Sequence, residues 1–113
     1  MSWRLTALRK GRSPDSGKDR MVVGLLQMAL RLPSPQSLKE KRWVVKSLVT
    51  RIQNKFNVSI AEVDFQNVWQ KATLAVAHVG NDRAFSNQLL DQVLNFTQRS
   101  REIEVIDSQL EFF

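Results

Sequence analysis

One block of the chain, Ser37–Lys55, carries the residues whose types and spacing suggest chemistry, with six basic side chains against a single glutamate. At helical spacing Trp43 falls opposite the apolar residues of this block, with Lys39 one turn before it and Lys46 three residues after it. An indole can stack on an unpaired base while cations neutralise phosphates, as in single-strand binders. The alternative is that Trp43 covers its neighbours' aliphatic stems. The block predicts an RNA-binding face formed by Lys39, Arg42, Trp43 and Lys46.

Groups for catalysis or metal binding are scarce. The absence of cysteine excludes disulfides and thiol catalysis, and the single histidine excludes a multi-histidine metal site. His78 alternates with Leu74 and Val76, which predicts a packed or hydrogen-bonded core histidine. Glu62 and Asp64, at i and i+2 of a predicted strand, share a face and could hold Mg²⁺ through water, although such pairs are common on wet strands. We expect no catalytic residue, no metal and no cofactor.

The chain has 113 residues, which is enough for one domain. The periodicity of its apolar residues predicts the helices and strands that position the residues above. Alternating or continuous apolar runs predict strands, and a capping box at Ser37 and a cap at Asp82 begin helices. The predicted order is strand 22–32, helix 37–55, strand 57–65, strand 69–79, helix 82–100 and strand 102–113. This β-α-β-β-α-β order predicts a ferredoxin-like α+β fold, a four-stranded antiparallel sheet with both helices on one face.

Helical spacing also predicts which side of each helix faces the core. The expected inward residues are Leu38, Val45, Leu48, Val49, Ile52 and Phe56 in the first helix, and Phe85, Leu89, Leu90, Val93 and Phe96 in the second. Lys39, Lys41 and Arg42 in the first turn of the first helix could attract an anion. Acylphosphatases share the predicted topology, but the loop LPSPQS has two prolines and no glycine to cradle a phosphate. We therefore expect neither an enzyme nor a small-molecule substrate.

The sheet face away from the helices is predicted to be semi-apolar. It lacks the aromatic signature with which RNA-recognition motifs stack bases. A surface of this kind more often marks a protein partner or a second copy. The alternative prediction is therefore a homodimeric interaction module without RNA binding, whose surface includes Leu25, Ala29, Trp69 and Ala75, unless an arm or loop covers it.

The first twenty residues differ from the rest. They hold six basic and two acidic side chains, for a net charge of +4, and include the Gly-, Ser- and Pro-containing run GRSPDSGKDR. We interpret 1–20 as a flexible basic arm before a domain at 21–113; an upstream start, an expression remnant, and an RNA-binding or targeting arm are alternative explanations. No run approaches the ~18 apolar residues of a membrane span. We expect a cytoplasmic protein with no membrane contact.

Several runs of residues resemble the bacterial YlxP-like family, a domain of unknown function often encoded beside genes for translation initiation and ribosome maturation. These runs are SLKEKR (37–42), NVSIAEVD (57–64), WQKATLAV (69–76), VGND (79–82) and DSQLEFF (107–113). The resemblance covers 21–113 and implies the ferredoxin-like fold and a link to RNA or ribosomes, without an established activity. The chain departs from the pattern in the arm, in Trp43 where a basic residue is common, and in Phe65 where histidine is common. The expected function is a non-catalytic accessory protein that binds RNA or a ribosomal component.

Overall fold

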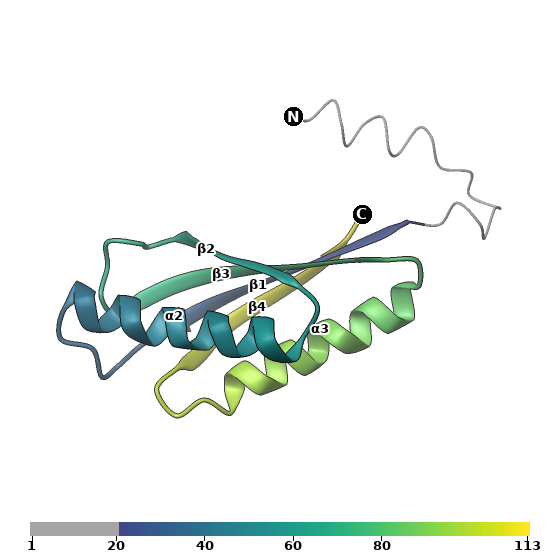
Figure 1. Cartoon of the computed structure of the whole chain (residues 1–113). Helices are drawn as coiled ribbons and strands as arrows, with labels where there is room; N and C mark the ends of the chain where they lie inside the picture. The colour runs from purple at the N-terminus through teal and green to yellow at the C-terminus, as the bar shows by residue number, and fades with distance from the viewer. Residues whose placement is uncertain (1–20) are drawn as a thin grey trace.

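The structure, a computed structural model, describes residues 21–113, so the predicted basic arm at 1–20 lies outside the described residues. Six elements follow one another in the order strand, helix, strand, strand, helix, strand (Figure 1). They are β1 (Val22–Arg31), α2 (Leu38–Lys55), β2 (Ser59–Asp64), β3 (Lys71–Gly80), α3 (Arg83–Gln98) and β4 (Glu104–Phe112).

The four strands form one sheet in the order β2-β3-β1-β4, and every neighbouring pair is antiparallel. Both helices lie on the same face of this sheet (Figure 1). The predicted ferredoxin-like α+β fold is therefore confirmed. Because β1 and β3 are central, each is hydrogen-bonded on both sides and its residues alternate between the two faces.

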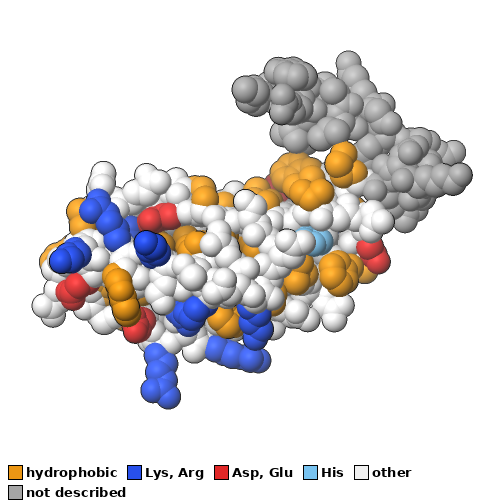
Figure 2. Space-filling model, in the orientation of Figure 1, with side chains coloured by type: hydrophobic (Ala, Val, Ile, Leu, Met, Phe, Trp, Pro, Cys, Tyr) orange, Lys and Arg blue, Asp and Glu red, His pale blue; other side chains and the backbone are white. Residues whose placement is uncertain are grey.

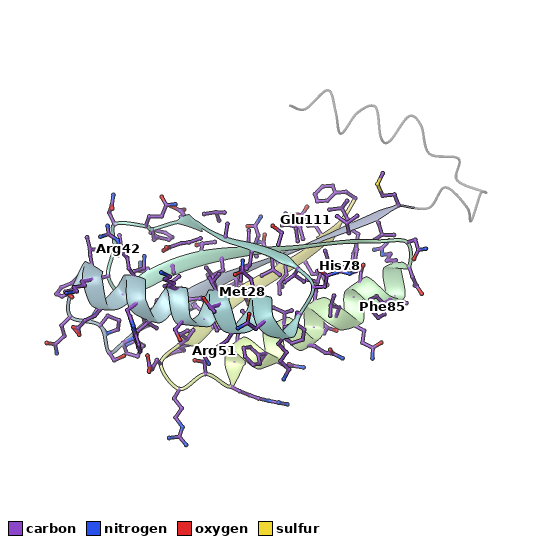
Figure 3. The ribbon with its side chains drawn as sticks, in the orientation of Figure 1. Met28, Arg42, Arg51, His78, Phe85 and Glu111 are labelled. Carbon is purple, nitrogen blue, oxygen red and sulfur yellow. The ribbon has the colours of Figure 1, made fainter. Side chains whose placement is uncertain are left out.

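The core lies between the sheet and the helices. Leu26, Met28 and Leu30 of β1 point toward the helices and are buried, and Figure 3 shows Met28 in this layer. Val45, Leu48 and Ile52 of α2 pack against them, as the helical spacing predicts. The alternate β1 residues lie on the face that the helices leave uncovered; they are half-buried, except Arg31, which is exposed.

Side-chain caps mark the first turns of both helices. The Ser37 hydroxyl accepts from the backbone N–H of Glu40 at 3.1 Å, and Asp82 caps α3 in the same way. The Glu40 carboxylate accepts from the backbone N–H of Gln36 at 3.3 Å, not from that of Ser37. In a capping box the glutamate accepts from the N–H of the N-cap residue itself. Here it accepts from the residue before the N-cap.

The start of α3 differs from the predicted inward face. Phe85 was expected in the core but is 56% exposed, and its ring lies beside that of His78 with the centroids 5.9 Å apart. The inward position is taken by Ser86, which is fully buried and hydrogen-bonded to His78. Figure 3 shows Phe85 and His78 at the same end of the molecule. Within residues 21–113, no helix combines the length and the apolar character that crossing a membrane requires.

Candidate nucleic-acid interface

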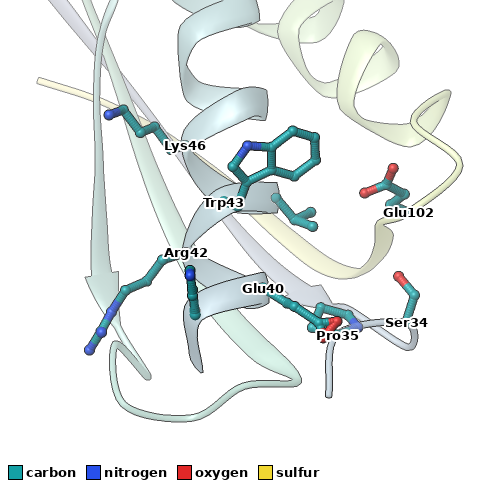
Figure 4. A pocket seen from close by; sticks show the side chains of 9 residues that line it. Ser34, Pro35, Glu40, Arg42, Trp43, Lys46 and Glu102 are labelled. Atoms are coloured by element: carbon teal, nitrogen blue, oxygen red, sulfur yellow. The ribbon is translucent and has the colours of Figure 1, made fainter. Parts of the chain in front are cut away.

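A surface groove of about 900 Å³ lies along the first two turns of α2. All four residues of the predicted RNA-binding face line it, together with residues from the β1–α2 loop and from the turn before β4 (Figure 4). Its lining is Ser34, Pro35, Lys39, Glu40, Arg42, Trp43, Val44, Lys46 and Glu102. Segments distant in the sequence thus meet at the predicted helix face.

Trp43 projects from α2 into the space between the helix and the turn before β4 (Figure 4). It is 69% exposed, more than any other large apolar residue in the described part of the chain. Its neighbour Val44 is buried at the edge of the core and also lines the groove. The arrangement leaves an indole open to a planar ligand, within the residues that the structure describes.

Three cations line the groove together with the indole, and Figure 4 shows Arg42 and Lys46 extending from α2 away from the Trp43 ring. Lys39, Arg42 and Lys46 are all exposed, and none of them pairs with a carboxylate among residues 21–113. In Figure 2, Lys and Arg side chains gather over the end of the molecule where α2 begins. A cation that forms no ion pair within the domain has no nearby carboxylate to offset its field, so the groove combines an aromatic surface with an electrostatic attraction for phosphate.

Lys41 lies in the same helix turn but takes no part in this surface. Its side chain is fully buried, and its ammonium donates to the Glu62 carboxylate and, at 2.7 Å, to the backbone carbonyl of Phe65. The expectation that Lys41 helps to attract an anion is therefore wrong. The helix turns this residue inward, where β2 supplies its counter-charge.

The same contact changes the interpretation of the two acidic residues of β2. The register between β2 and β3 shifts between Glu62 and Asp64, so that Glu62 lies opposite Leu74 on the helix side and Asp64 opposite Thr73 on the other side. The expectation that the two carboxylates share a face is wrong because this bulge breaks the alternation. Residues 21–113 contain no cluster of three or more candidate metal-ligating side chains of the His, Cys, Asp or Glu type.

The uncovered sheet face holds three of the four residues predicted for a partner surface. Leu25 and Ala29 of β1 and Ala75 of β3 lie there, all half-buried. Trp69 was expected in the third strand, but β3 begins at Lys71, and Trp69 lies in the preceding turn with 44% of its surface exposed. The connection between β2 and β3 spans residues 65–70, whereas the predicted strand bounds leave only residues 66–68.

His78 is the buried, hydrogen-bonded histidine that its alternation predicts. Its Nδ1 lies 2.7 Å from the Ser86 hydroxyl, and the histidine is 7% exposed. Ser86 has no exposed surface, so this pair cannot place its hydroxyl against a substrate without rearrangement. The contact ties β3 to α3.

The sequence analysis did not predict that Glu102, a charged residue, lines the groove. Glu102 lies in the turn between α3 and β4, and Figure 4 shows it across the groove from Trp43. No periodicity links position 102 to a helix that ends at Lys55. The α3–β4 turn reaches α2 only because both helices cover the same face of the sheet.

The sheet topology and the two helices on one face define a ferredoxin-like α+β protein. Residues 23–110 match the family described as "Protein of unknown function (DUF503)", and the chain belongs to this family. It is similar to the uncharacterized protein YlxP of Bacillus subtilis (strain 168), with 38% identity over 92 residues that cover 81% of this chain and 100% of that protein. Among solved structures it is similar to the de novo designed protein Foldit4, with 11% identity, a TM-score of 0.49, and coverage of 83% of this chain and 97% of that one.

Proposed function

We propose that this protein is a non-catalytic accessory factor that binds single-stranded RNA, free or within a ribosomal particle, through the α2 groove. The observation that carries the proposal is that Lys39, Arg42, Trp43 and Lys46 line one groove and are all exposed. In this arrangement a base stacks on the Trp43 indole and the three cations contact the flanking phosphates. Base stacking on an aromatic side chain contributes about 1–3 kcal/mol per base.

The ribosomal part of the proposal rests on the resemblance to the YlxP-like family, whose genes often lie beside those for translation initiation and ribosome maturation. The non-catalytic part rests on the residues of the described domain. The His78 and Ser86 pair is enclosed, and the buried Lys41 is held by Glu62. These are the groups in the domain that most resemble catalytic pairs, and both connect elements of the fold.

Photocrosslinking tests the position of the RNA. Single-stranded RNA containing 4-thiouridine, irradiated with the full chain, should crosslink mainly to the peptide that contains Trp43. The Trp43→Ala variant should lose most of this crosslink, whereas Trp69→Ala, which changes the other exposed tryptophan of the described domain, should keep it. Crosslinks that map to the sheet face, or that are equal in both variants, would contradict the proposal.

Co-sedimentation tests the ribosomal part. Purified ribosomal subunits layered with the full chain on a sucrose gradient should carry the protein with them at low salt. Lys39→Ala combined with Lys46→Ala should leave it at the top of the gradient. Co-sedimentation that is insensitive to this double change would place any ribosome contact elsewhere on the protein.

The second candidate function is a homodimeric module that uses the uncovered sheet face. The observation that favours it is a run of small or apolar side chains across the central strands, where Leu25 lies opposite Ala77 and Ala29 opposite Thr73. An apolar interface holds or strengthens with salt, whereas RNA binding weakens. Sedimentation equilibrium of the full chain should show a dimer that Leu25→Asp dissociates if this candidate is correct, and a monomer at all salt concentrations if it is not.

A further inference from the structure

The groove contains two carboxylates among its cations. Glu40 and Glu102 both line it, although a carboxylate close to a phosphate is repelled by it. A carboxylate therefore raises the affinity for a polyanionic ligand only where the ligand presents hydrogen-bond donors to it. In single-stranded RNA the N–H donors lie on the base edges, and the only donor of the backbone is the 2′-hydroxyl.

The two glutamates differ in what they already bind. The Glu40 carboxylate accepts the backbone N–H of Gln36 and serves the start of α2. The side chain of Glu102 has neither an ion-pair nor a hydrogen-bond partner among residues 21–113. Its two oxygens are therefore free, within the described domain, to accept hydrogen bonds from a ligand.

The backbone at Glu102 is held in place. Residues 100–103 form a turn in which the Ile103 N–H donates to the Ser100 carbonyl at 3.4 Å, and the Ile103 side chain is buried in the core. Figure 4 shows the carboxylate on the opposite side of the groove from the Trp43 indole. The groove volume, about 900 Å³, lies within the range of roughly 300–1,000 Å³ in which proteins bind small molecules, and both residues line it.

The chemistry of a carboxylate selects among the bases. It has only acceptors, and its two oxygens can receive two parallel N–H bonds. On its Watson–Crick edge guanine presents two adjacent donors, the N1–H and the N2 amino group. Adenine and cytosine each present one amino donor beside an acceptor nitrogen, and uracil presents one N–H between two carbonyl oxygens. A carboxylate therefore pairs fully with guanine and is repelled by an acceptor of each other base.

We propose that Glu102 is a specificity-determining residue of the groove, accepting the N1–H and N2–H bonds of a guanine that stacks on Trp43. The inference rests on the proposed RNA-binding function and deepens it, because it names the ligand as single-stranded RNA with an unpaired guanine. The cations bind the backbone, and Glu102 reads the base. A well-formed bidentate contact to a base discriminates by about 5- to 150-fold in affinity.

Fluorescence anisotropy with the full chain tests this assignment. The probes are labelled oligouridines that carry one central guanine, adenine or inosine. Inosine keeps the N1–H of guanine and lacks only the N2 amino group. The wild-type protein should bind the guanine oligonucleotide at least about fivefold more tightly than either of the others. Glu102→Gln should remove this preference and bind the adenine oligonucleotide as tightly as the wild type or more tightly, because a negative charge is lost.

The matched control is Glu111→Gln, which removes the same charge from β4, outside the groove, and should keep the preference for guanine. Equal binding of all three oligonucleotides by the wild type, with loss on Trp43→Ala, would overturn the role of Glu102 and leave the RNA-binding proposal standing. A preference for guanine that persists in Glu102→Gln would also overturn it. Absence of binding to every oligonucleotide would overturn both.

Discussion

Lys41 is a charged residue in a core position. It lies on the buried side of α2 with Val45 and Leu48, has no exposed surface, and pairs with Glu62. The ammonium also holds the carbonyl of Phe65, a residue with a positive φ of 62° at the end of β2. One lysine thus links α2, the end of β2 and the loop that follows it.

Removing one partner of this buried pair should destabilise the protein strongly. Lys41→Met leaves the partly buried Glu62 carboxylate without its counter-charge, and we expect the free energy of unfolding to fall by about 3–5 kcal/mol. Urea unfolding followed by circular dichroism measures the change. Lys41→Met combined with Glu62→Leu should recover most of the loss, because no uncompensated charge remains.

Lys39→Met is the control for this prediction. It makes the same change two residues earlier on the same helix, at an exposed position, and should alter the free energy of unfolding by less than about 0.5 kcal/mol. A Lys41→Met variant as stable as Lys39→Met would show that the buried ion pair does not hold β2 to α2.

At the scale of elements, a glycine sets how closely α3 approaches the sheet. A Cβ at Gly24 would lie 2.7 Å from Cδ1 of Leu90 and 3.2 Å from Cε1 of Phe112. Leu90 is fully buried in α3, and Phe112 packs from the edge strand β4. The absence of a side chain at Gly24 therefore lets the helix lie directly against β1.

Gly24→Ala should destabilise the protein although alanine suits a strand better than glycine does. The added methyl group meets Leu90, and overpacking of this kind costs about 1–3 kcal/mol. Chemical denaturation of Gly24→Ala, Leu90→Ala and the double variant measures the coupling. The double variant should lose less stability than the sum of the two single variants, since the clashing Cδ1 is gone. Strict additivity would contradict the contact.

Sequence periodicity predicts the elements well where one face of each is uniformly apolar. Both helices and the alternation of β1 and β3 are confirmed for that reason, and Ser37 and Asp82 are the N-caps as their residue types predict. It fails where a local feature breaks the period. The bulge after Glu62 sends Asp64 to the other face, and the long β2–β3 connection leaves Trp69 outside β3. Phe85 is placed wrongly because the buried Ser86 takes the inward position beside His78.

The groove is predictable only in part, for a similar reason. Lys39, Arg42, Trp43 and Lys46 lie within two turns of one helix, so helical spacing alone places them on a common surface. Glu102 comes from a turn that tertiary packing brings to this helix, and nothing local in the sequence indicates it. The sequence groups Lys41 with the exposed cations of the first helical turn, because the spacing of lysines does not reveal that Glu62 is its partner.

At the scale of the whole molecule, the core lies entirely within residues 22–103 of the described domain. A chain that begins at Met21 should therefore fold by itself, with a thermal midpoint close to that of the full chain. Differential scanning calorimetry of the two proteins checks this. A large fall in the midpoint would show that residues 1–20 contribute contacts to the folded domain.

Charge is distributed unevenly over the domain. Residues 21–113 carry a net charge of +2, whereas Ser37–Lys55 alone carries +5. The edge strand β4 is acidic, with Glu104, Asp107 and Glu111. A polyanion should therefore approach the α2 side and be repelled from the β4 edge, and this attraction should weaken as salt screens it.

The salt dependence of RNA affinity in the chain that begins at Met21 tests the central claim most directly, because the four net positive charges of residues 1–20 are then absent. Three cations on one strand predict that log affinity falls against log salt with a slope of roughly −2, from about −0.7 per contact. Lys39→Ala should flatten this slope by about 0.7, whereas Lys71→Ala, on the uncovered sheet face, should leave it unchanged. Trp43→Ala should cost about 1–3 kcal/mol and keep the slope. Equal slopes for Lys39→Ala and Lys71→Ala, with no loss on Trp43→Ala, would contradict RNA binding through the α2 groove.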